Sequence, residues 1–488
     1  MKKTMNLLLV LIYTFFLFGC NNNPDVGGKP DQGIVPTHDF SVNSYLQSNA
    51  VYLQKEEFEI NGKSENGVLI KADIYDENES LIKTASDIAD NNGDFNIKIV
   101  APEASYKTYK IVVSDTIHEH TYENILFGEV WICAGEQLNE TVVNEEKYNN
   151  EFIRIFNYDN NAYSWSTYNE SNVVYNMTWK LADELQKVIN VPVAIIDSTL
   201  AFANADAWIS HESASNQLKI QNYLKSINRY TESNENILFK TNTLSSMYST
   251  YLEQYKQINV RGVIWQQGVT DFNVSNNIDT YKLVSNYTYL TSNIFLEYMN
   301  LFNHKIDIYS IQNGFTDIHY ANQLRSAQEQ STYLVNKVHI IPTYDCHVLE
   351  NDEEITNVNY IFSVEKYIDR IVNDILSNTY QKKSEAAYSM FTNVVINNGK
   401  ITLTFSNDIE LQSVDEIYGL SVTTVDNIEL KYTTEIVENI IIIELENSIL
   451  IDDTNIIITY AENYDLYKCN LYNVNNKPVL PFRIVISD

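Results

Sequence analysis

The apolar residues of the chain follow two different patterns, and the changes between them divide the sequence. From residue 43 to 124, apolar and polar residues alternate in short runs such as Phe58-Glu59-Ile60 and Phe95-Asn96-Ile97. A period of two is typical of strands that bury one face. The segment Asn91-Asn92-Gly93-Asp94 favours a hairpin turn between two of these strands. We therefore predict a small N-terminal β-sandwich at residues 43–124.

Residues 125–385 combine short apolar runs with longer segments of helical period. The runs predict strands at 130–133, 193–196, 263–265, 306–311 and 338–341, and the period of 3.6 predicts helices at about 174–188, 244–257, 280–302 and 364–376. Strands that alternate with helices predict a parallel five-stranded sheet with helices on both faces. Ligands of such folds bind beyond the carboxyl ends of the strands. The expected site is therefore formed by the loops that follow Cys133, Ile196, Trp265, Ile311 and Tyr344.

Alternation returns after residue 385. Clear examples are residues 401–405, 440–445 and 456–460. We predict a second β domain at residues 386–488.

The N-terminus has the pattern of a targeting segment. Lys2 and Lys3 precede an apolar run at residues 7–18 that is too short for a comfortable membrane span. The ending L-F-G-C resembles a bacterial lipobox, in which Cys20 would carry the lipid. An uncleaved anchor helix is the alternative, and both place the protein outside the cytoplasmic membrane. Residues 21–42, with Gly27-Gly28 and several prolines, favour a flexible tether.

Charge and cysteine content narrow the possible partners. The formal net charge of −31 argues against nucleic acid and against an anionic lipid surface, since both bind basic side chains. We interpret the charge as a source of solubility.

With Cys20 assigned to lipid, Cys133, Cys346 and Cys469 remain, so at most one disulfide forms, and their spacing fits no zinc site. We expect no metal and no cofactor.

Several segments together resemble the sialate O-acetylesterases, a branch of the SGNH hydrolases. Residues 127–139 read F-G-E-V-W-I-C-A-G-E-Q-L-N, similar to G-E-V-W-L-C-S-G-Q-S-N-M of that family. Further similarities, in the family's order, lie at residues 193–208, 261–268 (R-G-V-I-W-Q-Q-G), 324–328 (L-R-S-A-Q), 470–473 and 481–483. The resemblance implies a flavodoxin-like α/β domain, and an ancestral reaction that hydrolyses O-acetyl esters of carbohydrates such as sialic acid.

The resemblance fails at the residues that carry the family's chemistry. The nucleophilic serine position is Gln137, and an amide cannot attack an acyl carbon as an alkoxide does. The oxyanion glycines fall on Ala201 and Phe202, where a bulky side chain is expected to obstruct substrate. The nearby asparagine falls on Asp271, whose charge would repel an oxyanion. Depending on a one-residue gap, the base position is Asn359 or Tyr360.

These joint substitutions predict a glycan-binding pseudoenzyme, because loss of several members of a catalytic unit costs on the order of a millionfold in turnover. The alternative is an active esterase with relocated residues, for which Asp317, His319 and His347 are candidates at strand ends. We interpret both histidines as ordinary loop residues. A purely structural surface protein is the third hypothesis.

The resemblance also suggests the residues of a binding site. The candidates for substrate binding are Gly135, Gln137, Trp265, Gln266, Gln267, Gly268 and Asp271. Aromatic and amide groups suit a polyhydroxylated ligand. We expect Trp131, Trp208 and Cys133 to pack in the core, whereas Trp265 is equally consistent with the core and with a sugar contact. The predicted partner is an acetylated or sialic-acid-containing glycan.

Overall fold

One long strand, β8 (Glu119–Gly135), connects the N-terminal sheets with the central sheet. Its first part pairs with β2 (Val51–Leu53) and β7 (Tyr109–Ser114), and its second part pairs with β11 (Val193–Thr199) and β12 (Gly262–Gln266). The domain border that we predict at residue 124 therefore falls inside a continuous strand.

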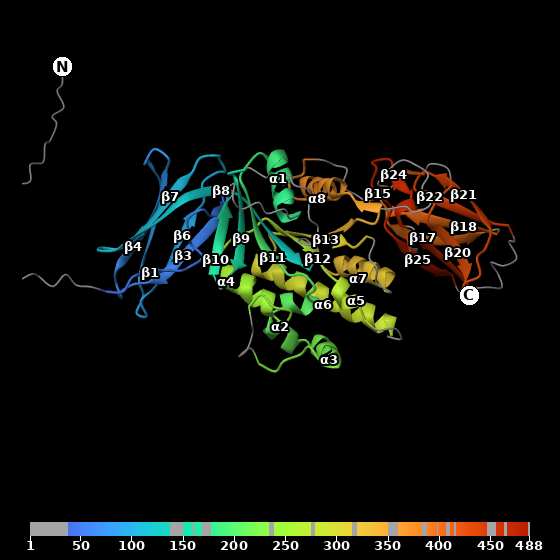
Figure 1. Cartoon of the computed structure of the whole chain (residues 1–488), viewed down its shortest axis with the longest axis horizontal. Helices are drawn as coiled ribbons and strands as arrows, with labels where there is room; N and C mark the ends of the chain where they lie inside the picture. Colours follow the sequence, from blue (N-terminus) through green and yellow to red (C-terminus); the bar gives the residue numbers. More distant parts are fainter. Residues whose placement is uncertain are drawn as a thin grey trace, which may run out of the picture. The chain divides into compact units, whose positions relative to one another are not determined.

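The computed structural model is mixed α/β with several sheets (Figure 1). The residues that it describes are 38–136, 150–159, 162–167, 177–233, 239–274, 279–314, 320–349, 360–382, 388–397, 399–406, 410–413, 416–446, 455–462 and 466–486. Residues Phe40–Asp488 form one compact unit.

The N-terminal strands form two sheets that share a core. One sheet has the order β1-β3-β6, and the other joins β4, β5 and β7 to β8. The remaining bounds are β1 (Ser41–Val42), β3 (Glu57–Lys63), β4 (Leu69–Asp76), β5 (Leu81–Ile88) and β6 (Asp94–Val100). Alternate residues of both sheets, such as Ile60, Ile97, Ile74 and Ile111, are fully buried in the same cluster. The predicted alternation is thus present, and it builds two packed layers.

The predicted hairpin at residues 91–94 is wrong, although a turn does form there. Asp90 accepts hydrogen bonds from the backbone of Asn92 and Asp94, and Gly93 has a φ of +80°. The strands on either side, β5 and β6, lie in different sheets, and β6 pairs with β3 instead. Turn chemistry is local, whereas the pairing partner of a strand depends on contacts far away in the sequence.

The central sheet has the order β10-β9-β11-β8-β12-β13-β14. The further bounds are β9 (Ile153–Asp159), β10 (Ala162–Thr167), β13 (Asp307–Gln312) and β14 (Val338–Pro342). All five predicted strands are present and run parallel to their neighbours in this sheet. Our prediction omitted β9, which is parallel to β11, and β10, which is antiparallel to β9.

Side chains of the central strands alternate between two hydrophobic clusters. Val130, Ile132 and Val263 belong to the cluster that includes α6 (Thr280–Leu301). Trp131, Cys133 and Ile264 belong to the cluster that includes α1 (Met177–Ile189) and α8 (Val364–Asn378). Figure 1 shows α1 and α8 on one side of the central strands and α6 on the other.

The predicted helices are largely present. α1, α6 and α8 correspond to three of them, and the fourth is a π-helical turn η2 (Tyr248–Leu252) followed by α4 (Glu253–Tyr255). Sequence periodicity missed η1 (Ala205–Trp208), α2 (His211–Asn216), α3 (Leu218–Ser226), α5 (Val269–Phe272) and α7 (Ala321–Tyr333). A short antiparallel pair, β15 (His347–Leu349) and β16 (Tyr360–Phe362), precedes α8.

The C-terminal β domain has its own core. Its sheets have the orders β17-β18-β22-β21, β20-β23-β25 and β19-β24. The bounds are β17 (Phe391–Asn397), β18 (Lys400–Phe405), β19 (Leu411–Gln412), β20 (Leu420–Thr424), β21 (Tyr432–Val437), β22 (Ile440–Leu445), β23 (Ile456–Tyr460), η4 (Leu466–Lys468), β24 (Tyr472–Asn473) and β25 (Phe482–Ile486). Tyr344 of the central part joins this core and donates a hydrogen bond to the carbonyl of Val479 (2.8 Å).

Two further findings bear on the sequence-based expectations. Cys133, Cys346 and Cys469 are all buried. In the part of the chain that the structure describes, no helix combines the length and the apolar character needed to cross a bilayer.

Candidate functional site

The ends of three neighbouring strands place the expected site. Gly135 of β8 is in register with Thr199 of β11 and with Gln266 of β12. Gly135 has a φ of +112°, and a Cβ atom there would lie 2.0 Å from the carbonyl oxygen of Gln266. Only glycine therefore fits at this point, where the chain leaves the sheet.

Glu136, the next residue, turns its carboxylate into the protein. It is 1 % exposed and accepts hydrogen bonds from the backbone N–H groups of Gly268 (2.9 Å) and Thr270 (3.0 Å). Gly268 has a φ of +128°, and any Cβ there would meet Leu324 and Tyr287. The carboxylate thus binds the backbone of the β12–α5 turn.

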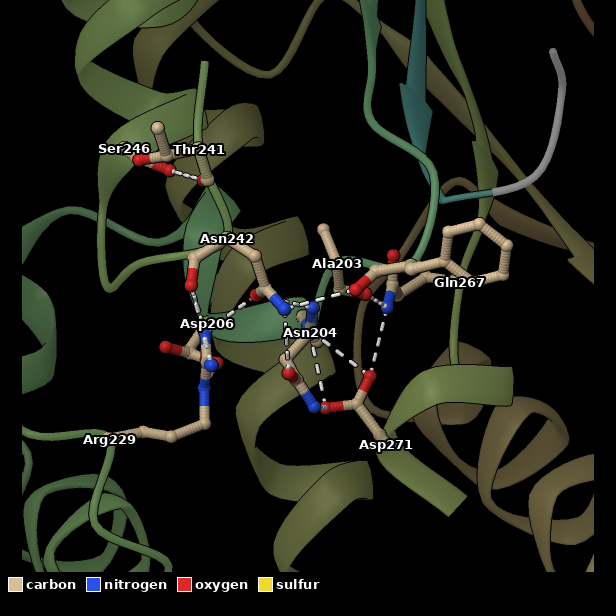
Figure 2. A network of polar contacts seen from close by, with 11 residues as sticks. Ala203, Asn204, Asp206, Arg229, Thr241, Asn242, Ser246, Gln267 and Asp271 are labelled. Atoms are coloured by element: carbon tan, nitrogen blue, oxygen red, sulfur yellow. Dashed lines mark hydrogen bonds and ion pairs between the residues drawn. The ribbon is translucent and has the colours of Figure 1, made fainter. Parts of the chain in front are cut away.

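Asp271 is the second buried carboxylate of the site. It is 5 % exposed and accepts hydrogen bonds from Gln267 Nε2 (2.9 Å), the backbone N–H of Ala205 (3.1 Å) and Asn204 Nδ2 (3.2 Å). Figure 2 shows Asn204 and Gln267 directed at this carboxylate. Asp271 therefore accepts hydrogen bonds from the turn after β11 and from Gln267.

The turn that follows β11 is held by a network of polar contacts. Asn242 Nδ2 donates to the carbonyl of Phe202 (3.0 Å), and Gln267 Nε2 donates to that of Ala203 (2.7 Å). The Arg229 guanidinium pairs with Asp206 (2.6 Å) and also donates to Asn242 Oδ1 (2.9 Å), as Figure 2 shows. These contacts fix the segment that resembles the family's oxyanion loop.

Burial raises the pKa of each of the three buried carboxylates of this region. Burial, followed by the negative charge of Asp271, raises the pKa of Glu136 to about 7. Burial raises the pKa of Asp271 to about 6, against the hydrogen bond from Gln267 and with a contribution from Asp206. The pKa of Asp206 is also raised by burial, although Arg229 opposes the effect. Negative charge is thus unfavourable in this region.

Several predicted site residues lie outside the described residues. These are Cys20, Gln137, Asp317, His319 and Asn359. His347 and Tyr360 begin the strands β15 and β16, and the structure describes only their backbone. Neither the nucleophile position nor a relocated base is therefore placed.

Trp265 is a core residue, so its assignment as a sugar contact is wrong. It is 1 % exposed and packs edge-on against Trp208, Phe295 and Tyr298, with ring centroids 5.7, 5.9 and 6.4 Å away. The pleat of β12 turns Trp265 towards α6, away from the strand ends. The core positions predicted for Trp131, Trp208 and Cys133 are confirmed by their complete burial.

The other candidates divide between exposed and buried positions. Gln266 is half-buried and accepts a hydrogen bond from Tyr367 Oη (2.6 Å), whereas Gln267 is 1 % exposed. Phe202 is 74 % exposed and has a φ of 57°. Its side chain is exposed to solvent, and its obstruction of substrate stays a prediction.

Sequence reasoning missed the charged groups of the network. Glu136 and Asp206 lie within the segments 127–139 and 193–208 that carry the resemblance, so their charge was visible in the sequence. Arg229 and Asn242 lie in segments without a motif, and no sequence signal indicated them. The described residues around Gly135 show no group of His, Cys, Asp and Glu side chains with metal-ligand spacing.

Comparison with known proteins identifies the fold. No protein-family model and no curated protein sequence matches the chain. XAC1771, described as a carbohydrate acetylesterase from Xanthomonas citri, is similar over 91 % of this chain and 99 % of its own, with a TM-score of 0.71 and 17 % identity. Est2A, an acetyl xylan esterase from Butyrivibrio proteoclasticus, matches over 71 % of this chain and 100 % of its own. Its TM-score of 0.28 and identity of 10 % are too low to indicate a shared fold.

The similarity to XAC1771 includes the N-terminal sheets, the central sheet and the C-terminal β domain, since it spans almost the whole of both chains. At this level of identity it identifies the architecture alone. The chain therefore has the fold of a protein described as a carbohydrate acetylesterase.

Proposed function

We propose that this protein binds O-acetylated carbohydrate at the carboxyl edge of its central sheet and does not hydrolyse the ester. The observation that carries the proposal is Asp271, a buried carboxylate at the position where a sialate O-acetylesterase has an oxyanion-binding asparagine. Acyl transfer needs hydrogen-bond donors aimed at the developing oxyanion. Here the donors of Asn204, Ala205 and Gln267 already bind Asp271.

Glu136, the second buried carboxylate, also disfavours hydrolysis at this edge. Glu136 occupies the backbone N–H groups of Gly268 and Thr270, which lie in the same turn as Asp271. An oxyanion that formed at this edge would meet two acidic groups, and the electrostatic interaction would be repulsive. A neutral acetyl group carries no such penalty, so binding without hydrolysis is compatible with the site.

The carbohydrate class of the ligand rests on the fold and on the sequence motifs. XAC1771 is described as a carbohydrate acetylesterase, and the segments at residues 127–139 and 261–268 resemble those of the sialate O-acetylesterases. We therefore propose an SGNH-type, flavodoxin-like domain with an acetylated or sialic-acid-containing glycan as partner. The L-F-G-C segment supports an extracytoplasmic protein that is anchored through a lipid on Cys20.

Hydrolysis of 4-nitrophenyl acetate and of an O-acetylated sialic acid tests the proposal. We expect turnover within about tenfold of the buffer for the protein and for its Gln137→Ser variant, because the serine would still lack oxyanion donors. The double variant Gln137→Ser/Asp271→Asn restores a donor and is the matched comparison. Turnover by the unaltered protein well above that of the buffer contradicts the proposal.

An active esterase with relocated residues is the second candidate, and one contact favours it. Ser215 Oγ lies 3.2 Å from His211 Nδ1, while His211 Nε2 lies 2.8 Å from the carbonyl of Thr231. Donation from Nε2 to that carbonyl leaves Nδ1 free to accept the hydroxyl proton, as a general base must. The two residues are also four apart on α2, where such contacts are common on helix surfaces. Loss of any measured turnover in Ser215→Ala and His211→Ala would select this candidate.

A further inference from the structure

A cavity lies beside the central sheet. It has a volume of about 550 Å³, and its walls come from α6, α7, the end of β13 and the C-terminal strands β17 and β25. This size is within the range of about 300–1,000 Å³ that is common for small-molecule sites. None of its lining residues contributes to the hydrogen bonds of Glu136 or Asp271. We refer to this cavity as the α7 groove.

The α7 groove and the edge around Gly135 share a structural connection. Gln328 of α7 accepts a hydrogen bond from the backbone N–H of Asn313 (2.9 Å), directly after β13. The same amide donates to the carbonyl of Gln267 (2.9 Å). Gln328 itself does not line the groove, but it links α7, the helix that does, to the turn after β12.

Aromatic rings line one part of the groove. Phe482 is half-buried and packs against Phe391 (5.8 Å between centroids) and Phe405 (5.5 Å), so its position is fixed. Tyr333, at the end of α7, is 56 % exposed. Rings that are held in place and partly exposed offer apolar surface to the C–H faces of a sugar, at little cost in side-chain entropy.

Amide groups supply the polar part of the lining. Asn322, Gln323 and Gln330 of α7 are all at least partly exposed in the groove. Gln312 closes the end of β13, is 1 % exposed, and its Oε1 has no hydrogen-bond partner among the described residues. Amides both donate and accept, which matches the hydroxyl groups of a saccharide.

The charged side chains of the groove are already bound within the protein. Arg483 pairs with Glu462 (2.7 Å), and Arg325 donates to the carbonyl of Gly314 (3.1 Å) and to Asn322. Glu329 accepts a hydrogen bond from Tyr333 Oη. A ligand therefore has no need to bring a charge, and the net charge of −31 disfavours a polyanion at long range.

We propose that the α7 groove binds a segment of an uncharged oligosaccharide. That the ligand is a carbohydrate rests on the proposed function. That it binds in the α7 groove and is uncharged rests on the residues that line the groove. The groove then holds the chain of a glycan next to the edge where its acetyl group is bound. Binding there does not depend on whether the ester is hydrolysed.

Isothermal titration calorimetry with neutral hexasaccharides tests the inference. The probes are cellohexaose, xylohexaose, mannohexaose and chitohexaose, and hexagalacturonate is the charged probe of equal length. We expect at least one neutral probe to bind, and hexagalacturonate to bind at least about tenfold more weakly. Failure of all four neutral probes at millimolar concentration, or tighter binding of hexagalacturonate, overturns the proposal.

Variants locate the binding. Tyr333→Ala removes an exposed ring of the groove, and Tyr281→Ala removes a ring that is 82 % exposed outside it. We expect Tyr333→Ala to weaken binding at least about tenfold and Tyr281→Ala to leave it unchanged. Ser326→Trp, which fills the groove, should have the same effect as Tyr333→Ala. Unchanged affinity in both groove variants places the saccharide elsewhere and overturns the proposal.

The two proposals fail separately in these experiments. Ester hydrolysis by a protein whose groove variants lose saccharide binding contradicts the non-hydrolytic function alone. Absence of both hydrolysis and groove binding contradicts the groove alone, because absence of hydrolysis is what the proposed function expects.

Discussion

Replacing Arg370 with methionine is expected to lower the free energy of unfolding by about 3–5 kcal/mol, the usual cost of removing one partner of a buried ion pair. Arg370 of α8 donates to both carboxylate oxygens of Asp345, and their side chains are only 6 % and 3 % exposed. Asp345 also accepts a hydrogen bond from Tyr472 of the C-terminal domain (3.1 Å). The pair therefore joins α8, the end of the central sheet and the C-terminal domain.

Urea unfolding followed by tryptophan fluorescence measures this effect. Arg483→Met is the matched control, because Arg483 pairs with Glu462 at a 51 % exposed position, and such pairs contribute at most about 1 kcal/mol. Equal losses in the two variants would contradict the assignment of Arg370 as the principal partner of Asp345. Retention of stability in Arg370→Met would show that Lys366, 3.0 Å from Asp345, is sufficient.

The same pair predicts a dependence on acid. Burial alone would raise the pKa of Asp345, but the hydrogen bonds and charge of Arg370, with Lys366, lower it to about 2. Because the pKa of Asp345 is lowered in the folded state, its ionised form stabilises the protein above the ordinary pKa of 3.8. This stability is lost as the pH falls from about 4 to about 2. The loss should be smaller in Arg370→Met, since its Asp345 has a weaker partner.

Replacing Glu136 with glutamine is expected to stabilise the protein at pH 8 by about 1–3 kcal/mol and to have little effect at pH 5. Glu136 is 1 % exposed, and burial together with Asp271 raises its pKa from 4.5 to about 7. Because the pKa of Glu136 is raised in the folded state, its neutral form contributes fully to stability below the ordinary pKa of 4.5. This stability is lost as the pH rises through about 7. Glutamine cannot ionise, so the variant avoids the buried charge.

Thermal unfolding between pH 5 and pH 8 checks this expectation. The unaltered protein should become less stable as the pH rises from 5 to about 7 and change little above that, and Glu136→Gln should flatten the falling part of the curve. Asp271, with a pKa of about 6, keeps part of the slope in the lower half. Glu57→Gln, at a side chain that is 53 % exposed, is the control. Parallel curves for Glu136→Gln and the unaltered protein would show that Glu136 is not the titrating group.

Local periodicity was sufficient for most of the elements. The predicted helix at residues 280–302 is α6 (Thr280–Leu301), and the predicted strand at 306–311 is β13 (Asp307–Gln312). Both contain uninterrupted repeats that a few neighbouring residues define. α7 was missed because its apolar positions are few, and Arg325 and Gln328 occupy its buried side.

Motif resemblance pointed to the carboxyl ends of the strands but not to the directions of the side chains there. Gly135 and Gly268 lie at the strand ends and have the positive φ values that only glycine tolerates easily. Trp265, from the same motif, packs in the core, because the pleat of β12 decides its direction. The exposure of Phe202 was likewise not visible in the sequence.

The sequence alone determined the alternation of strands and helices, the strand ends that carry Gly135 and Gln266, and the net negative charge. These features depend on residue identity and on neighbours within a few positions. Only the tertiary structure decided that β5 and β6 lie in different sheets, that Glu136 and Asp271 share a buried region, and that α7 and β25 enclose a groove. The physical reason is that strand pairing, burial and electrostatic coupling depend on contacts between residues that lie far apart in the chain.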